Sequence, residues 1–195
     1  MKSRGGGSDI DLGLGIIDDE VIIGLAVIDQ GECGDYEQHN AYYTLYSNGL
    51  LEIYGTGRVD SGDWDKSAVV TVDMSDTLAD MHTKVFEDHT ALVSAKLPNE
   101  MNAVHGETFK GCTSLASIEL SENITHINLK AFQGCTSLAS ITIHATTPPV
   151  LGTDVFDGCT ALTAIYVPYD SMDAYKAASN WSTYASLIQA IPSGD

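Results

Sequence analysis

Cysteine and histidine are the residue types in this sequence whose chemistry could make an enzyme. Three cysteines recur at one repeated position, Cys112, Cys135 and Cys159, and six histidines are scattered along the chain. A thiolate beside a histidine is a common nucleophile in hydrolases. A cysteine that returns at one stacked position is, however, more simply explained as a small, half-buried apolar residue. No pair of carboxylates is singled out for glycoside hydrolysis either, so a hydrolase is the least favoured interpretation and no catalytic residue is predicted.

Residues 60–65 are the segment whose composition comes nearest to a metal site. They read Asp-Ser-Gly-Asp-Trp-Asp, but no bidentate glutamate follows at the spacing of a calcium loop. The histidines show no ligand spacing with cysteines or acids. The glycines at 5–7 lie before any expected strand, so they do not form a phosphate loop. We therefore expect a solvated turn at residues 60–65, no metal and no cofactor.

The net charge of −18 comes from 27 acidic and 9 basic residues. Such a field repels phosphate backbones, which argues against nucleic acid as a partner; its simplest role is solubility. No stretch of about 20 uninterrupted apolar residues exists, so no membrane span is expected. The charge of Met1–Arg4 is followed by glycines and then by the acidic residues 18–20, so no signal peptide is visible.

All four phenylalanines belong to a repeat. Phe86, Phe109, Phe132 and Phe156 are separated by 23, 23 and 24 residues. A threonine follows each of them by four positions and a leucine by six. Apolar pairs follow by nine and eleven positions: Ala95/Leu97, Ile118/Leu120, Ile141/Ile143 and Ile165/Val167. Matches at this many fixed offsets indicate a repeat architecture.

The spacing of the apolar pairs predicts how the repeats pack. Residues two apart lie on one face of a short strand, which is buried only when the next repeat stacks beside it. Pairs eight and five positions before each phenylalanine predict a second inward edge: Leu78/Met81, Met101/Val104, Ile124/Ile127 and Pro148/Leu151. Gly111, Gly134 and Gly158 predict a turn just after each phenylalanine. The first repeat has Asp88 and His89 where the others have glycine and cysteine, so it reads as a degraded copy.

Both ends of the repeat array have their own signals. Upstream, residues 60–82 predict an incomplete capping coil with Trp64 near the expected phenylalanine place. Asn48-Gly49 predicts the turn of a hairpin over residues 39–59, whose tyrosines either pack on the first coil or form a binding patch. Downstream, Ser171 is a candidate N-cap of a helical lid. Bulky apolar groups are available to cover the last coil: Tyr175, Trp181, Tyr184, Leu187 and Ile188.

The repeat Phe-x-Gly-Cys-Thr-Ser-Leu-x-x-Ile-x-Leu resembles the leucine-rich repeat of BspA-type surface proteins. The tail Ile165-Tyr-Val-Pro, followed by residues 174–178 and 181–184, is similar to the closing segment common in that family. The resemblance covers about residues 63–192. It implies a mostly β fold with short helices: a short leucine-rich-repeat solenoid of about five coils, with an N-terminal β-hairpin region and a C-terminal helical cap. It also implies a non-enzymatic adhesion or recognition protein, displayed by host-associated anaerobic bacteria or some protists.

Residues 1–31 are not explained by the repeat. Alternating apolar residues precede an acidic turn at 18–20, and residues 21–28 are almost continuously apolar, which predicts a second hairpin. This segment either caps its own domain or forms an attachment arm for a partner, a homo-oligomer or a larger particle. The candidate attachment residues are Ile10, Leu12, Leu14, Ile16, Val21, Ile23, Leu25 and Val27.

The candidate ligand-binding residues are those expected to point outward from successive coil strands: Lys96, Glu119, Thr142 and Tyr166. We call them the outward ladder; an ordinary solvated sheet face is the alternative. The predicted segments are 1–31 (arm), 32–59 (hairpin lead-in), 60–168 (solenoid) and 169–195 (cap). The predicted function is extracellular, surface-displayed recognition of a protein or glycan on a host or cell surface. A structural appendage of a bacteriophage virion, docked through residues 1–31, is the alternative.

Overall fold

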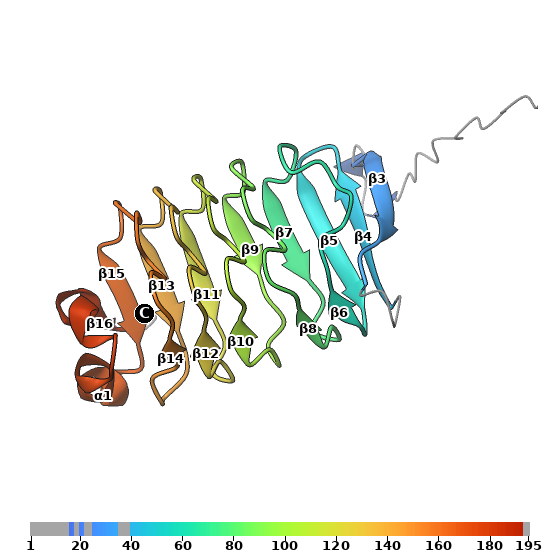
Figure 1. The fold of residues 1–195 in the computed structure, drawn as a ribbon. Helices are drawn as coiled ribbons and strands as arrows, with labels where there is room; N and C mark the ends of the chain where they lie inside the picture. The colour runs from blue at the N-terminus through green and yellow to red at the C-terminus, as the bar shows by residue number, and fades with distance from the viewer. Residues whose placement is uncertain (1–15, 18–19, 22–24, 35–39, 193–195) are drawn as a thin grey trace, which may run out of the picture.

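The structure is a computed structural model that describes residues 16–17, 20–21, 25–34 and 40–192. Within these ranges the chain winds into a row of coils that ends in a short helical segment (Figure 1). The strands are β1 (Ile16–Ile17), β2 (Glu20–Val21), β3 (Val27–Glu32), β4 (Ala41–Tyr46), β5 (Leu50–Gly55), β6 (Arg58–Val59), β7 (Thr71–Met74), β8 (Asp80–Met81), β9 (Ser94–Lys96), β10 (Ala103–Val104), β11 (Ser117–Leu120), β12 (His126–Ile127), β13 (Ser140–Ile143), β14 (Val150–Leu151), β15 (Ala164–Val167) and β16 (Ile188–Ala190). The helices are α1 (Met172–Ala177) and the 3-10 helices η1 (Tyr169–Ser171) and η2 (Ser182–Leu187).

The strands that carry the apolar pairs form one side of each coil. They pair in the orders β3-β4-β5-β7-β9 and β11-β13-β15-β16, and every pairing from β5 onward is parallel. The register keeps equivalent positions side by side, so that Ile141 lies opposite both Ile118 and Ile165. This arrangement confirms the predicted solenoid. The five predicted coil strands are β7, β9, β11, β13 and β15, and the hairpin strand β5 extends their row.

A second row of short strands forms the other buried edge. It pairs as β6-β8 and as β10-β12-β14, again in parallel. Met81, Val104, Ile127 and Leu151 point from this row into the core and are fully or almost fully buried. The predicted second edge is therefore present; Pro148 is an exception, because it is only half-buried and the next residue, Pro149, is buried instead.

The repeated phenylalanines stack into a column through the solenoid. The ring centroids of Phe86 and Phe109, and of Phe109 and Phe132, are 5.5 Å apart, and those of Phe132 and Phe156 are 5.8 Å apart. Trp64 stacks on Phe86 at 6.2 Å, which confirms that it takes the place of a phenylalanine in the capping coil. Other aromatic rings close the column at its two ends: Tyr43 beside Trp64, and Trp181 and Tyr184 beside Phe156.

The repeated cysteines also have a structural role. The thiols of Cys112, Cys135 and Cys159 donate hydrogen bonds of 3.0–3.1 Å to the phenylalanine carbonyls of the preceding coils. Cys112 and Cys135 are fully buried, and none of the four cysteines forms a disulfide. Each of these carbonyls also accepts a backbone N–H, as Phe109 does from Cys112, so the thiol adds a second hydrogen bond that links one coil to the next.

Each of the four phenylalanine coils has two residues in the left-handed backbone region. The first, two positions after the phenylalanine, was predicted from its glycines, and Gly134 has φ 76° there. Asp88 adopts the same conformation with φ 62°, so the first coil is less degraded than expected. The second site, two positions before the phenylalanine, was not predicted because no glycine marks it. Its residues have φ between 56° and 65°: Lys84, Glu107, Lys130 and Asp154.

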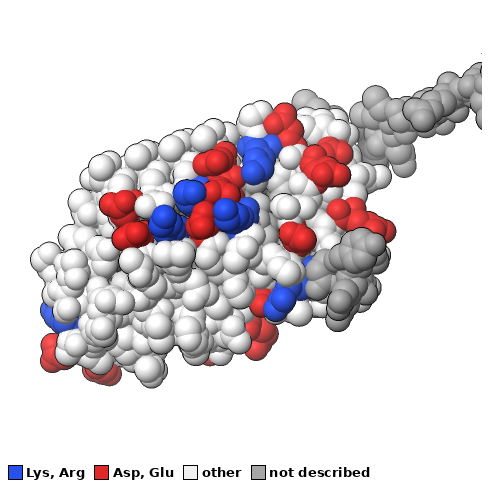
Figure 2. All heavy atoms as spheres, viewed as in Figure 1, with Lys and Arg blue, Asp and Glu red and all other residues white. Residues whose placement is uncertain are grey.

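Both rows of strands are interrupted between the Phe86 coil and the Phe109 coil. Among the described strands, none of the pairings joins β9 to β11 or β8 to β10. Backbone bonds on the turn side still cross this junction, such as Phe86 N–H to the Thr108 carbonyl at 3.0 Å. Two ion pairs also bridge it, Lys84 to Glu107 at 3.2 Å and Lys110 to Glu87 at 2.8 Å. They lie within a surface patch where both signs of charge interleave (Figure 2).

The C-terminal cap contains less helix and more strand than the sequence predicts. Helix α1 covers only six residues, and Ser171 holds the N-cap position without a side-chain capping bond. Tyr175 and Trp181 are fully buried, and they donate hydrogen bonds to the carbonyls of Ala145 (2.8 Å) and Pro149 (2.7 Å). Strand β16, which was not predicted, pairs in parallel with β15 and extends the sheet by one strand.

The N-terminal strands correct the predicted arrangement of residues 1–31. β1 and β2 pair as an antiparallel hairpin, as predicted. The apolar stretch 21–28 was assigned to this hairpin, but its end belongs to the main sheet: β3 begins at Val27 and pairs with β4. The boundary expected between residues 31 and 32 therefore falls inside β3, because residues 27–31 have backbone partners in the main sheet.

The hairpin of β4 and β5 forms as predicted, although its turn is longer than the two residues expected. The Gly49 N–H donates to the Tyr46 carbonyl at 2.9 Å, and Asn48 Oδ1 accepts from the Leu50 N–H at 3.0 Å. Gly49 is the left-handed residue, with φ 84°. The turn is therefore centred on Ser47 and Asn48, one residue earlier than the sequence predicts.

Two glycines in equivalent loops should respond oppositely to alanine. A Cβ at Gly152 would lie 2.5 Å from the Leu129 backbone nitrogen, whereas a Cβ at Gly106 would meet nothing closer than 3.5 Å. We expect Gly152→Ala to lower the free energy of unfolding by about 1–3 kcal/mol, because backbone atoms must move. Gly106→Ala should be neutral or stabilising by up to about 1 kcal/mol, because it restricts the unfolded chain. Urea unfolding of both variants measures the contrast; equal losses would contradict it.

Candidate functional site

The outward ladder lies on the exposed face of the long row of strands. Thr142 is in register with Glu119 on one side and Tyr166 on the other. Lys96 belongs to the preceding block of strands, in register with Asp73, which is itself opposite Glu52. The structure thus places the four predicted residues on one face. Glu119, Thr142 and Tyr166 lie side by side, whereas Lys96 lies across the junction between the two blocks of strands. Gln189 of β16 extends the row beyond Tyr166.

The charged members of this face are paired rather than free. Lys96 Nζ lies 3.3 Å from Asp73 Oδ1, and Glu119 is in contact with the imidazole of His144. Neither His144 nor Asp73 was among the predicted site residues. Asp73 could have been found by extending the ladder one coil upstream, because it stands 23 residues before Lys96. His144 follows its strand directly, so the periodic pattern alone does not single it out.

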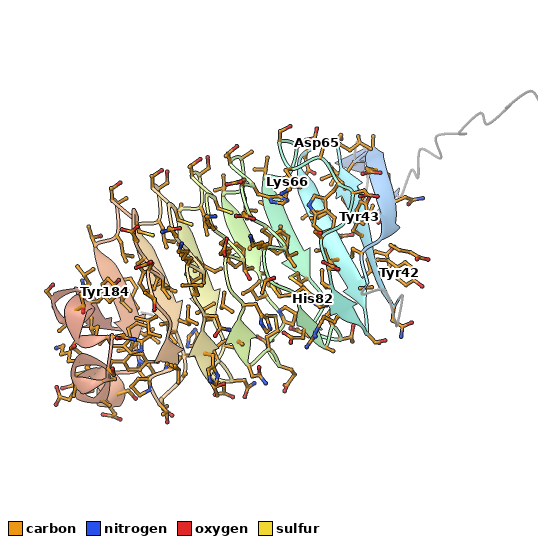
Figure 3. The ribbon with its side chains drawn as sticks, in the orientation of Figure 1. Tyr42, Tyr43, Asp65, Lys66, His82 and Tyr184 are labelled. Atoms are coloured by element: carbon orange, nitrogen blue, oxygen red, sulfur yellow. The ribbon has the colours of Figure 1, made fainter. Side chains whose placement is uncertain are left out.

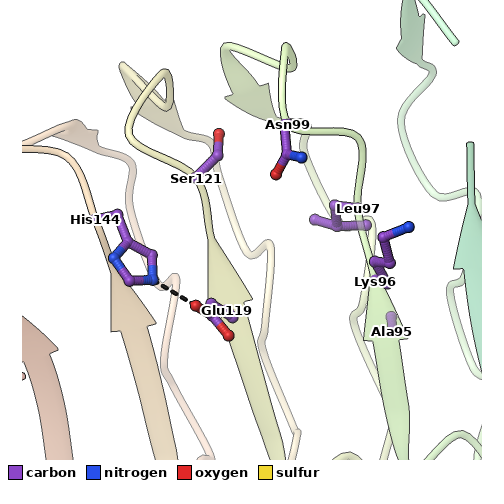
Figure 4. A pocket seen from close by; sticks show the side chains of 7 residues that line it. All are labelled: Ala95, Lys96, Leu97, Asn99, Glu119, Ser121 and His144. Atoms are coloured by element: carbon purple, nitrogen blue, oxygen red, sulfur yellow. Dashed lines mark hydrogen bonds and ion pairs between the residues drawn. The ribbon is translucent and has the colours of Figure 1, made fainter. Parts of the chain in front are cut away.

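A cavity of about 370 Å³ opens where the two blocks of strands part. It is lined by Ala95, Lys96, Leu97, Asn99, Glu119, Ser121 and His144 (Figure 4). Ala95 occupies the place that isoleucine holds in the next three coils, so this junction has less side-chain volume. The Oγ of Ser121 is buried and has no hydrogen-bond partner. A buried hydroxyl without a partner is costly, so this wall of the cavity has an unused donor and acceptor.

A second depression of about 470 Å³ adjoins the first across Lys96. It is lined by Glu52, Ile53, Tyr54, Asp73, Ser75, Asp76 and Lys96. Together the two hollows span the face from β5 to His144, the residue after β13, with Lys96 common to both. Their volumes lie in the range of roughly 300–1,000 Å³ found for small-ligand sites. We refer to the two hollows together as the face groove.

The four thiols and the buried imidazole of His89 lie outside the face groove, and burial suppresses the reactivity of Cys33 and Cys112. Burial raises the pKa of the Cys112 thiol to about 12, and burial together with Asp60 raises that of Cys33 to about 12. Burial lowers the pKa of His89 to about 4. Within the described ranges, no three metal-ligating side chains come together, and no helix is long and apolar enough to cross a membrane.

The predicted attachment residues are only partly open to description. Ile10, Leu12, Leu14 and Ile23 lie outside the described residues, and Ile16 and Val21 are described only as backbone in β1 and β2. Leu25 and Val27 are each 47% exposed, at the sheet edge formed by β3. These two members of the predicted attachment segment therefore present apolar side chains to the surface.

The architecture is that of a parallel-strand solenoid whose open surface is a polar sheet face. A family model described as a BspA type leucine rich repeat region, with 6 copies, matches residues 62–180. The chain therefore belongs to the BspA-type leucine-rich-repeat family, as the phenylalanine repeat predicted. Homologous proteins of this class occur at the bacterial cell surface. A search of curated protein sequences finds no match to this chain.

Two solved structures of bacterial leucine-rich-repeat proteins are similar to this chain. A leucine rich cell surface protein from Faecalibacterium prausnitzii matches 79% of this chain and 41% of its own length, with 26% identity and a TM-score of 0.52. A leucine-rich repeat protein from Bacteroides ovatus matches 72% of this chain and 46% of its own, with 17% identity and a TM-score of 0.48. The chain thus spans less than half the length of these proteins. The family model and the Faecalibacterium prausnitzii match give no support to the bacteriophage alternative.

Proposed function

We propose that this chain is a non-enzymatic recognition module displayed on a bacterial surface, and that it binds a protein or glycan through the face groove. The observation that carries the proposal is the junction between β9 and β11. There the sheet parts and leaves a cavity lined by two ladder residues and by the unpartnered hydroxyl of Ser121. Lys96, Asn99 and Glu119 supply donors and acceptors along this cavity, as the few polar groups of a ligand site do.

The surroundings of the cavity also support binding. Lys96 and Glu119, on opposite sides of the junction, are each in contact with a neighbouring polar side chain, Asp73 and His144, so less rotamer freedom remains to be lost when a ligand binds. Surface display is supported by membership of a family of surface proteins and by the likeness to the Faecalibacterium prausnitzii protein.

The test is a binding screen of the full chain against immobilised oligosaccharides and purified extracellular proteins. We expect the wild type to bind at least one probe, and the double variant Lys96→Ala/Glu119→Ala to bind it roughly tenfold more weakly, which corresponds to about 1.4 kcal/mol. The matched control is Asp173→Ala/Lys176→Ala, which removes one acid and one base from α1 instead. Equal affinity of the two double variants, or silence across all probes, would refute the proposal.

A further inference from the structure

Two exposed tyrosines stand at the N-terminal end of the face groove. Tyr42 of β4 and Tyr54 of β5 are opposite each other in the hairpin register, with ring centroids 6.0 Å apart and planes inclined by 27°. They remain 38% and 46% exposed, unlike Tyr43, which points inward and packs on Trp64. Tyr42 lies at the end of the solenoid opposite to Tyr184 (Figure 3). Exposing the apolar surface of an aromatic ring to water is unfavourable. A ligand with an apolar face that covers this stacked, exposed pair would remove that surface from water.

Tyr54 also lines the 470 Å³ hollow, whose other polar groups are held in place. Glu52 accepts a hydrogen bond of 2.8 Å from the Tyr46 hydroxyl, and Asp76 accepts one of 2.9 Å from the Asn99 N–H. The third carboxylate, that of Asp73, faces the ammonium of Lys96. Each carboxylate retains further acceptor sites, and the ammonium has three donors. The hollow therefore combines an aromatic platform with fixed acceptors and one fixed donor.

A saccharide unit has the complementary chemistry. One face of a pyranose ring carries C–H groups that pack on an aromatic ring, while its hydroxyls donate to carboxylates and accept from an ammonium. Three carboxylates against one ammonium give the hollow a net negative charge, within a chain of net charge −18. Such a field repels sialylated, sulfated and uronic-acid sugars. The same charge attracts a lysine-rich peptide, but the side chains of such a peptide have no flat apolar face to pack on the exposed tyrosine pair.

We propose that Tyr42 and Tyr54, with Glu52, Asp73, Asp76 and Lys96, form a saccharide subsite that takes neutral or amino sugars and excludes anionic ones. This inference rests on the proposed recognition function and adds the chemical class of its ligand. The ring of one sugar unit packs on the exposed tyrosine platform, and its hydroxyls reach the three carboxylates. The adjoining cavity at the β9–β11 junction then receives the next unit of the chain.

The full chain is tested against three immobilised probes: neutral hexose and N-acetylhexosamine oligosaccharides, the same glycans with terminal sialic acid, and a lysine-rich peptide. We expect binding to the first set, and at least about tenfold weaker binding to the second. Tyr54→Ala and Tyr42→Ala should each weaken glycan binding roughly tenfold, and Tyr54→Phe should retain it within about threefold. Tyr169→Ala, which removes a 77% exposed tyrosine outside the face groove, is the matched control. Thermal unfolding verifies that each variant is folded.

The outcomes separate this inference from the broader one. Preferential and salt-sensitive binding to the lysine-rich peptide overturns the saccharide subsite, as does equal binding to sialylated and neutral glycans. If the neutral glycans do not bind but a purified extracellular protein does, and that binding is lost in Lys96→Ala/Glu119→Ala, the recognition function stands and the subsite falls. Silence of every probe removes both.

Discussion

Phe132→Ala should lower the free energy of unfolding by about 3–5 kcal/mol, the largest loss expected from a single substitution in this chain. Phe132 is fully buried and lies between two parallel rings, Phe109 at 5.5 Å and Phe156 at 5.8 Å. Removing it opens a cavity in the middle of the column and ends two stacking contacts at once. The rigid coils on either side have strand pairings in both rows, so they cannot collapse into the space.

Urea unfolding followed by circular dichroism measures this loss. Leu129→Ala serves as the matched control, because Leu129 lies in the same coil but is 46% exposed, and we expect it to cost less than about 1 kcal/mol. Phe132→Leu, which keeps most of the apolar volume, should fall between the two. If Phe132→Ala and Leu129→Ala unfold at the same urea concentration, the column is not the main source of stability.

The pair of Trp64 and His89 should make the stability of the first coils depend on pH. Trp64 Nε1 donates a hydrogen bond of 2.7 Å to His89 Nε2, so this nitrogen must be unprotonated. Burial lowers the pKa of His89 from 6.5 to about 4, with Lys66 and two backbone bonds as smaller influences. The unfolded chain therefore takes up a proton near pH 6.5, whereas the folded chain does so only near pH 4.

The stabilisation from unprotonated His89 is therefore fully present above about pH 7, and it is lost as the pH falls from 6.5 towards 4. For a shift of this size we expect a loss of about 2 kcal/mol between pH 7.5 and pH 5. His89→Gln, whose side-chain oxygen still accepts from Trp64, should flatten the dependence over this interval. His126→Gln, at an exposed position, should leave it unchanged. Urea midpoints at pH 7.5, 6 and 5 measure the slope, and an unchanged slope in His89→Gln would rule out His89 as its source.

The sequence predicted the coils well because each coil has the same marks at the same offsets. The period of Phe86, Phe109, Phe132 and Phe156 is enough to place the strands, the second edge and the left-handed glycines. It failed where a structure depends on a partner distant in the chain. Strand β16 has no phenylalanine to mark it, and it exists because β15 offers an open edge. In the sequence, His89 looks like a lost repeat cysteine. In the structure, it accepts a hydrogen bond from Trp64, which lies 25 residues earlier in the chain.

The sequence predicted which residues of the candidate site face outward, but not the cavity between them. The alternation of inward and outward residues identified Lys96 and Glu119, because the period of a strand is two. It could not show that these two residues face each other across an interruption of the sheet. The one sequence feature that indicates the cavity is Ala95, which stands where isoleucine recurs in the later coils. Lys130 and the other non-glycine left-handed residues gave no signal, since their side-chain types rarely adopt that conformation.

The junction between the Phe86 and Phe109 coils has a mechanical consequence. Both rows of strands stop there, while the ring column and the turn-side hydrogen bonds continue across. On the other two sides only isolated contacts cross, such as the Ala116 N–H to the Val93 carbonyl at 3.1 Å and His105 to Asp80 at 3.0 Å, so fewer bonds oppose a change of angle here than between the later coils. Lys96 and Glu119 line the junction cavity from opposite sides. A ligand gripped between them would therefore set the angle between the two blocks, and the angle would in turn set how tightly the ligand is held.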